Sequence, residues 1–162
     1  MTPRRPRCVL RTGLAAILAG VSMGGAAGVP ALAHHSFAMF DTGRVVRIDG
    51  TIAEFQWTNP HAWAEVDVVN PDGAVDRWGV EFNSPNNLTR EGWSRDMLAP
   101  GDEVSFFIHP MRDGRPGGLY YEVILADGET VTVRMTPFQP EDGFDTQNAP
   151  SAYDAPASDD GE

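Results

Sequence analysis

The sequence predicts a mainly β protein: a small OB-like Greek-key barrel of five or six strands, with one short helix between the third and fourth strands. Three observations lead to this prediction. Apolar residues between positions 45 and 135 recur with a period of two rather than 3.6. Turn residues separate these alternating segments at short intervals. A single segment, residues 84–92, carries helix signals, and it follows the third predicted strand.

Three strands are expected to form a meander at the start of the domain, over residues 45–57, 62–69 and 77–82. The first changes its in-out phase between Ile52 and Phe55, as expected if Gly50 marks a bulge or a sharp bend. The turn signal Asn70-Pro71-Asp72-Gly73 separates the second strand from the third.

The helix signals are specific to its two ends. Ser84 can cap the first free amides, Pro85 fits the first helical position, and Gly92 can end the helix in a left-handed conformation. Two or three more strands follow, over residues 103–109, 119–125 and 131–135. A small β-sandwich is the alternative architecture, but a barrel accounts more readily for a single helix between the third and fourth strands.

Composition divides the chain into a signal peptide at 1–33, a barrel domain at 34–136 and a disordered acidic tail at 137–162. The first region has an arginine-rich start, a short apolar run and the cleavage pattern Ala31-Leu32-Ala33. The tail has seven acidic residues, no basic residue and few large apolar ones, so it cannot offset its ordering entropy. We expect a periplasmic or secreted protein with no stable membrane insertion after cleavage.

The charge balance narrows the expected partners. The formal net charge is −11, and removing the four arginines of residues 1–33, which contain no acidic residue, lowers it to −15. So acidic a chain repels nucleic acid and anionic membrane surfaces, and neither is expected as a partner. A metal ion or a small molecule fits this balance better. Cys8, the one cysteine, lies in the predicted signal peptide, so the mature protein has no thiolate ligand.

The four histidines suggest a metal site. Cleavage after the predicted signal peptide would make His34 the first residue, and its α-amine and ring Nδ1 could then chelate one metal ion. His61 and His109, expected in two loops on one rim of the barrel, could complete a nitrogen set, while His35 is the weaker candidate. Such a set favours copper first and zinc second. Taken singly, each histidine can instead be an ordinary polar residue of its loop, and processing near Ala26 would remove the amine ligand.

A second candidate site is the exposed face of the second and third strands. It would present an aromatic platform beside carboxylates, formed by Trp63, Glu65, Asp67 and Glu81. No nucleophile elbow, phosphate loop or dinucleotide fingerprint occurs, so we expect binding rather than catalysis. The leading hypothesis is copper handling in the cell envelope through the N-terminal histidine chelate. The alternative is a metal-free module that binds a small molecule or a protein.

Several motifs occur in order along residues 34–128. Among them are His34-His35-Ser36-Phe37, Trp57-Thr58-Asn59-Pro60-His61, Ser84-Pro85, Pro100-Gly101-Asp102 and His109-Pro110. Together they resemble an uncharacterised family of exported bacterial proteins, a domain of unknown function. The resemblance implies an exported single domain and brings no activity with it, and the acidic tail lies outside it.

Overall fold

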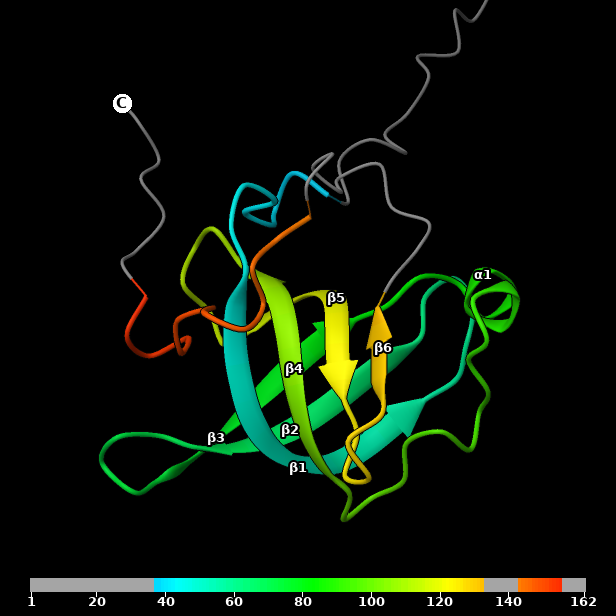
Figure 1. Ribbon diagram of the computed structural model, residues 1–162, viewed down its shortest axis with the longest axis horizontal. Coiled ribbons are helices and arrows are strands. Elements are labelled where there is room, and N and C mark those ends of the chain that lie inside the picture. The colour runs from blue at the N-terminus through cyan, green and yellow to red at the C-terminus, as the bar shows by residue number, and fades with distance from the viewer. Residues whose placement is uncertain (1–36, 133–142, 156–162) are drawn as a thin grey trace, which may run out of the picture. The chain divides into compact units, whose positions relative to one another are not determined.

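The computed structural model describes residues 37–132 and 143–155. Within these ranges the elements are β1 (Val46–Gln56), β2 (Trp63–Val69), β3 (Val75–Glu81), α1 (Pro85–Arg90), β4 (Glu103–Pro110), β5 (Gly117–Ile124) and β6 (Thr130–Thr132) (Figure 1). The predicted mainly β class is confirmed, and α1 lies between the third and fourth strands as expected.

The strands close into a barrel. The hydrogen-bonded order is β3-β2-β1-β4-β5-β6, and β3 also pairs with β5, so strands β1 to β5 form a closed ring with β6 added to β5. The closing pair is parallel and runs from Gly79 opposite Gly117 to Glu81 opposite Leu119, whereas all the other strand pairs are antiparallel. This is the OB-type Greek-key arrangement that the sequence predicts, rather than the alternative sandwich.

The first strand serves two neighbours, which requires it to bend. Its first half pairs with β4 and its second half with β2, and Thr51 pairs with both (Figure 1). A Cβ atom at Gly50 would overlap the carbonyl oxygen of Asp67, so only glycine allows this close approach. The register shifts between Ile52 and Glu54. The expected phase change is therefore confirmed, although the bulge lies beyond Gly50.

The helix begins and ends at the predicted residues. The hydroxyl of Ser84 accepts a hydrogen bond from the Asn87 amide, Pro85 opens the helix, and Gly92 follows it with a φ of +98°. Leu88 is fully buried and directs α1 towards the core. Phe82, Trp93, Phe106 and Tyr120 form the aromatic part of this core, with ring centroids 4.6–6.2 Å apart for the contacting pairs.

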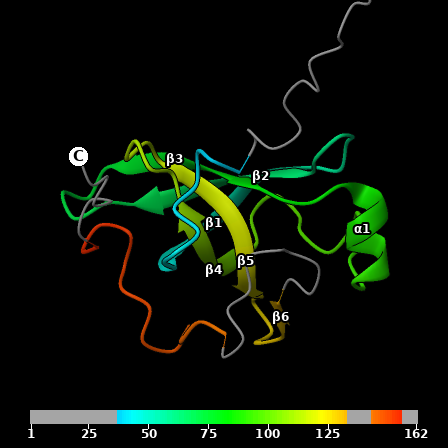
Figure 2. The same ribbon diagram turned by 90° about the horizontal axis from the view of Figure 1, so that it is seen from above.

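Residues 143–155 contact the outside of the barrel. Ser151 forms a parallel bridge with Arg47, and this segment passes beside β1 (Figures 1 and 2). The hydroxyl of Tyr153 donates to a carboxylate oxygen of Asp76 at 2.9 Å and accepts from Nε1 of Trp78 at 3.1 Å. The predicted disorder of the tail therefore does not hold for residues 143–155. The rest of the tail, the signal peptide, His34, His35 and the end of the strand expected at 131–135 lie outside the described residues.

Candidate functional site

The predicted face of β2 and β3 has the predicted register. Trp63 pairs with Glu81, Glu65 with Gly79, and Asp67 with Arg77. These side chains are all partly exposed or exposed. The indole ring of Trp63 lies across Gly79, where a Cβ atom would overlap it. The missing side chain on β3 thus lets Trp63 lie against the sheet.

Two of the predicted carboxylates are engaged within this face. The guanidinium of Arg77 donates to Glu65 and to Asp67, each at 2.6 Å. These hydrogen bonds, the one to Asp67 first, raise the pKa of Arg77 above its ordinary value. Because one arginine holds both acids, Trp63 and Glu81 are the members of the predicted face that remain for another partner.

Glu81 is paired with the histidine of the β1–β2 loop. Nδ1 of His61 lies 2.5 Å from Oε1 of Glu81, and their side chains are 36% and 15% exposed, respectively. A carboxylate at this distance accepts a hydrogen bond from Nδ1–H. In the neutral ring the lone pair is then on Nε2. His61 therefore lies where the sequence predicts, in the loop between β1 and β2, and its side chain is partly exposed.

A cleft of about 300 Å³ lies next to this pair, where β3 meets β5. Trp63 and Glu81 line one side, and the segment before β1 and the loop after β4 line the other. The remaining lining residues are Met39, Phe40, Gly79, Met111, Arg115, Pro116, Gly117 and Gly118. Cβ atoms at Gly117 and Gly118 would crowd the backbone of β3 and β4, so this glycine pair permits the close strand contact beside the cleft.

The cleft has one cationic lining residue, and that residue is paired. Nε of Arg115 lies 2.7 Å from a carboxylate oxygen of Asp113. The arginine lowers the pKa of Asp113, chiefly through this hydrogen bond. The positive charge at the cleft is thus balanced within its own loop.

The chain that leads to the predicted N-terminus is fixed beside the same cleft. Phe40 forms an isolated antiparallel bridge with Met111 and is buried. The amide of Asp41 donates to the carbonyl of Pro110 at 2.8 Å, and the amide of Arg112 donates to that of Met39 at 2.9 Å. The segment from Met39 to Asp41 is therefore held against the end of β4 and the loop that follows it.

His109 differs from its predicted position. It lies within β4 rather than at the start of a rim loop, and it is 1% exposed. Its Nδ1 lies 2.8 Å from the carbonyl oxygen of Arg44, and its ring has edge contacts with Tyr121 and Phe144. Burial lowers the pKa of His109, although the Arg44 carbonyl and Asp41 oppose this. The prediction of a rim position is wrong because residues 143–155 cover this part of the sheet.

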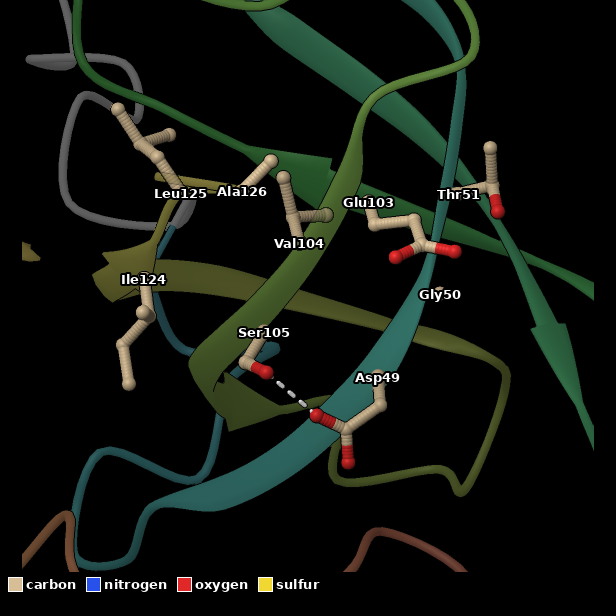
Figure 3. Close-up of a pocket in the computed structure, with 9 residues that line it drawn as sticks. All are labelled: Asp49, Gly50, Thr51, Glu103, Val104, Ser105, Ile124, Leu125 and Ala126. Atoms are coloured by element: carbon tan, nitrogen blue, oxygen red, sulfur yellow. Dashed lines mark hydrogen bonds between the residues drawn. The ribbon is translucent and has the colours of Figure 1, made fainter. Parts of the chain in front are cut away.

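A second hollow, of about 440 Å³, lies on β1, β4 and the end of β5. Figure 3 shows Asp49 and Glu103 on its rim, with Ser105 donating a hydrogen bond to Asp49. Arg47 also donates to Asp49, at 2.8 Å, and to Ser105, at 3.1 Å. Asp49 and Ser105 are thus bonded to each other and to Arg47, and the hollow contains none of the predicted site residues.

Within residues 37–132 and 143–155, no group of three or more His, Cys, Asp or Glu side chains could hold a metal ion. A metal at His61 would need ligands of another kind or from outside these ranges. Met39 and Met111 line the cleft and carry thioether sulfur, a ligand of another kind that the sequence pattern does not single out. Their separation in the chain hides their proximity, which depends on the bridge between Phe40 and Met111.

The chain matches a family model but no curated protein. A family described as a family of unknown function, DUF6152, matches residues 24–122. Curated proteins give no match. The described part of the chain also contains no helix that is long and apolar enough to cross a membrane.

Two solved structures are similar over 51% of this chain. One is Rim1, a mitochondrial single-stranded DNA-binding protein from S. cerevisiae, with 12% identity, a TM-score of 0.39 and 92% of its own chain covered. The other is TiaS in its complex with tRNA and ATP, with 15% identity and a TM-score of 0.38, and here the match spans 18% of the TiaS chain. At these values neither likeness carries an argument about function.

Proposed function

This chain belongs to DUF6152, a family of unknown function. We propose that it is an exported copper-binding domain of the cell envelope. It holds Cu(II) with the α-amine and ring of His34, as the first residue of the mature protein, and with Nε2 of His61. Copper is the first choice because it leads the affinity order of divalent metals for nitrogen ligands, and zinc is second.

The observation that carries this proposal is the pair formed by His61 and Glu81. Histidines that bind metals usually donate their other ring N–H to a carboxylate or a carbonyl, which fixes the tautomer and makes the ligand nitrogen more basic. Nδ1 of His61 is held by Glu81 at 2.5 Å, and the histidine side chain is 36% exposed. The ring is thus oriented through Nδ1, and the side chain is partly exposed, as a metal ligand requires.

The fixed segment beside the cleft supports the participation of His34. Phe37 is the first described residue, and Phe40 is held by its bridge to Met111. His34 is three positions before Phe37, and at roughly 3.3 Å per position this stretch spans about 10 Å. A histidine at the mature N-terminus would therefore reach the rim of the cleft. We leave His109 out of the ligand set because it is buried in β4.

The test is a Cu(II) titration followed by electron paramagnetic resonance, on protein beginning at His34. One equivalent should bind with nitrogen hyperfine structure, and His61→Ala or one extra residue before His34 should each weaken binding, because each removes a ligand. His35→Ala is the matched control and should leave the affinity unchanged. Binding that survives both the extension and His34→Ala would overturn the chelate, and tighter binding of zinc would overturn the choice of metal.

A metal-free binding module is the second candidate, and the apolar walls of the cleft favour it. Met39, Phe40, Trp63 and Met111 line a space of about 300 Å³, which is the size of a small-ligand pocket. No binding of copper or zinc by any of these forms, combined with a ligand-dependent change in Trp63 fluorescence, would favour this candidate.

A further inference from the structure

Two methionines at the cleft are not used by the nitrogen chelate. Met39 lies in the segment before β1, and Met111 directly follows β4. The bridge between Phe40 and Met111 and the hydrogen bond from the Arg112 amide to the Met39 carbonyl bring the two stretches together. Both methionines line the cleft that contains Trp63 and Glu81.

The exposure of Met39 does not fit a purely structural role. Its relative exposure is 43%, which makes it one of three large apolar residues that are exposed in the described chain. The other two, Val69 and Val75, pair with each other next to the β2–β3 turn, away from the cleft. Met39 instead lines the cleft together with Met111, Trp63 and Glu81.

This combination has a specific metal preference. Thioether sulfur is a soft, uncharged ligand that selects Cu(I) over the harder divalent ions, whereas imidazole binds several metals. An indole ring attracts a cation that lies over its face within about 6 Å. A cleft lined by two thioethers and an indole therefore suits a soft monovalent cation.

We propose that this cleft is a Cu(I) site, with the sulfur atoms of Met39 and Met111 as ligands and the ring of Trp63 beside the ion. The inference rests on the proposed copper function for its metal and adds the oxidation state. The two ligand sets then differ: nitrogen ligands from the N-terminus and His61 hold Cu(II), and the sulfur ligands of the cleft hold Cu(I). The protein retains copper in either state, and each state can be supplied separately.

Because the two ligand sets differ, the same substitutions should affect Cu(I) and Cu(II) affinity differently. Methionine also fills gaps in apolar packing, so the variants must keep the side-chain volume. Met39→Leu and Met111→Leu do so and remove only the sulfur. Met97→Leu is the matched control, because Met97 packs against the core and lines a different hollow, beside Asp102 and Asp127.

The experiment is an anaerobic titration of the mature protein with Cu(I) in competition with a colorimetric chelator, run beside the Cu(II) titration. Each cleft Met→Leu variant should lower the Cu(I) affinity at least about tenfold, since the loss of even an outer partner of a metal ligand costs 10–100-fold. Cu(II) affinity should remain within about twofold of the parent value. X-ray absorption of the Cu(I) form should show sulfur neighbours, which Met97→Leu leaves in place.

The outcomes separate this inference from the proposed function. An extra residue before His34 should weaken Cu(II) binding and spare Cu(I) binding. Cu(I) binding that is unchanged in both cleft variants, or an absorption spectrum without sulfur, overturns the thioether site. If Cu(II) binds and Cu(I) does not, the nitrogen chelate stands and the thioether site fails. If only Cu(I) binds, through sulfur, the thioether site stands and the nitrogen chelate fails.

Discussion

His61 and His109 have the same side chain and come from loops or strand ends that the sequence places on one rim, yet the structure gives them opposite environments. His61 is partly exposed, and its Nδ1 is held by the carboxylate of Glu81. His109 is buried, and its Nδ1 is held by the neutral carbonyl of Arg44. A carboxylate partner and an accessible Nε2 suit a ligand, whereas aromatic neighbours and burial suit a packing residue. The burial of a histidine and the hydrogen-bond partner of its ring therefore indicate its role better than its position along a strand.

The largest expected effect separates the two histidines by stability. His109→Ala should lower the free energy of unfolding by roughly 2–4 kcal/mol, because it leaves a cavity beneath Tyr121 and Phe144. His61→Ala removes one partly exposed hydrogen bond to Glu81 and should change the same free energy by less, about 1 kcal/mol. Urea denaturation of both variants measures this. Equal losses would show that His61 also has a structural role.

The next effect concerns the carboxylate that distinguishes His61. Glu81→Gln keeps the size of the side chain but removes the charge that orients the imidazole, so Cu(II) affinity should fall about 10–100-fold. Glu65→Gln is the control on the same face, because Arg77 already engages Glu65. Isothermal titration of the two variants should differ clearly. Similar affinities would show that Glu81 does not act through His61.

Much of the fold follows from local sequence signals. The turn at residues 70–73 sets the register of β2 and β3, and this register places Trp63 opposite Glu81. The capping serine and the glycine after the helix set the bounds of α1. These features depend on residues that are close in the sequence, so pattern and turn chemistry suffice to predict them.

The burial of His109 and the cleft itself depend on distant segments. Alternation in β4 shows which residues share a face, but it cannot show that Phe144 covers the face of His109. The acidic, proline-rich composition around Phe144 indicates disorder instead. Gly117 and Gly118 likewise belong to a predicted loop, but they open β5 and pair with β3. Long-range pairing decides these contacts, and a single sequence contains no direct signal for it.

A smaller effect tests the segment that buries His109. Ending the chain after Asp142 removes Phe144 and Tyr153, with the hydrogen bonds of Tyr153 to Asp76 and Trp78. We expect the free energy of unfolding to fall by at least about 1 kcal/mol, since each such bond contributes about 0.5–1.5 kcal/mol before the ordering entropy is offset. A chain ending after Ala155 is the control and should match the full chain. Identical thermal unfolding of both truncated forms would show that the packing of residues 143–155 adds no stability.

The smallest expected effect is a pH dependence of stability that comes from the buried His109. Burial lowers the pKa of His109 in the folded protein, whereas in the unfolded chain it lies near its ordinary value of about 6.5. As the pH falls below that value, the unfolded chain takes up a proton that the folded protein still excludes, so stability decreases until the lowered pKa is reached. Above about pH 7 this contribution is fully present. The groups around the ring are the Arg44 carbonyl, Asp41, Tyr121 and Phe144, and burial outweighs Asp41.

His109→Gln removes the titration and keeps a donor for the Arg44 carbonyl. The difference in unfolding free energy between the parent and this variant, measured by urea denaturation from pH 7.5 to 5.0, should therefore shift in favour of the variant as the pH falls. A difference that stays constant, or shifts in favour of the parent, would show that the buried ring accepts a proton as readily as an exposed one and would remove the distinction between His109 and His61.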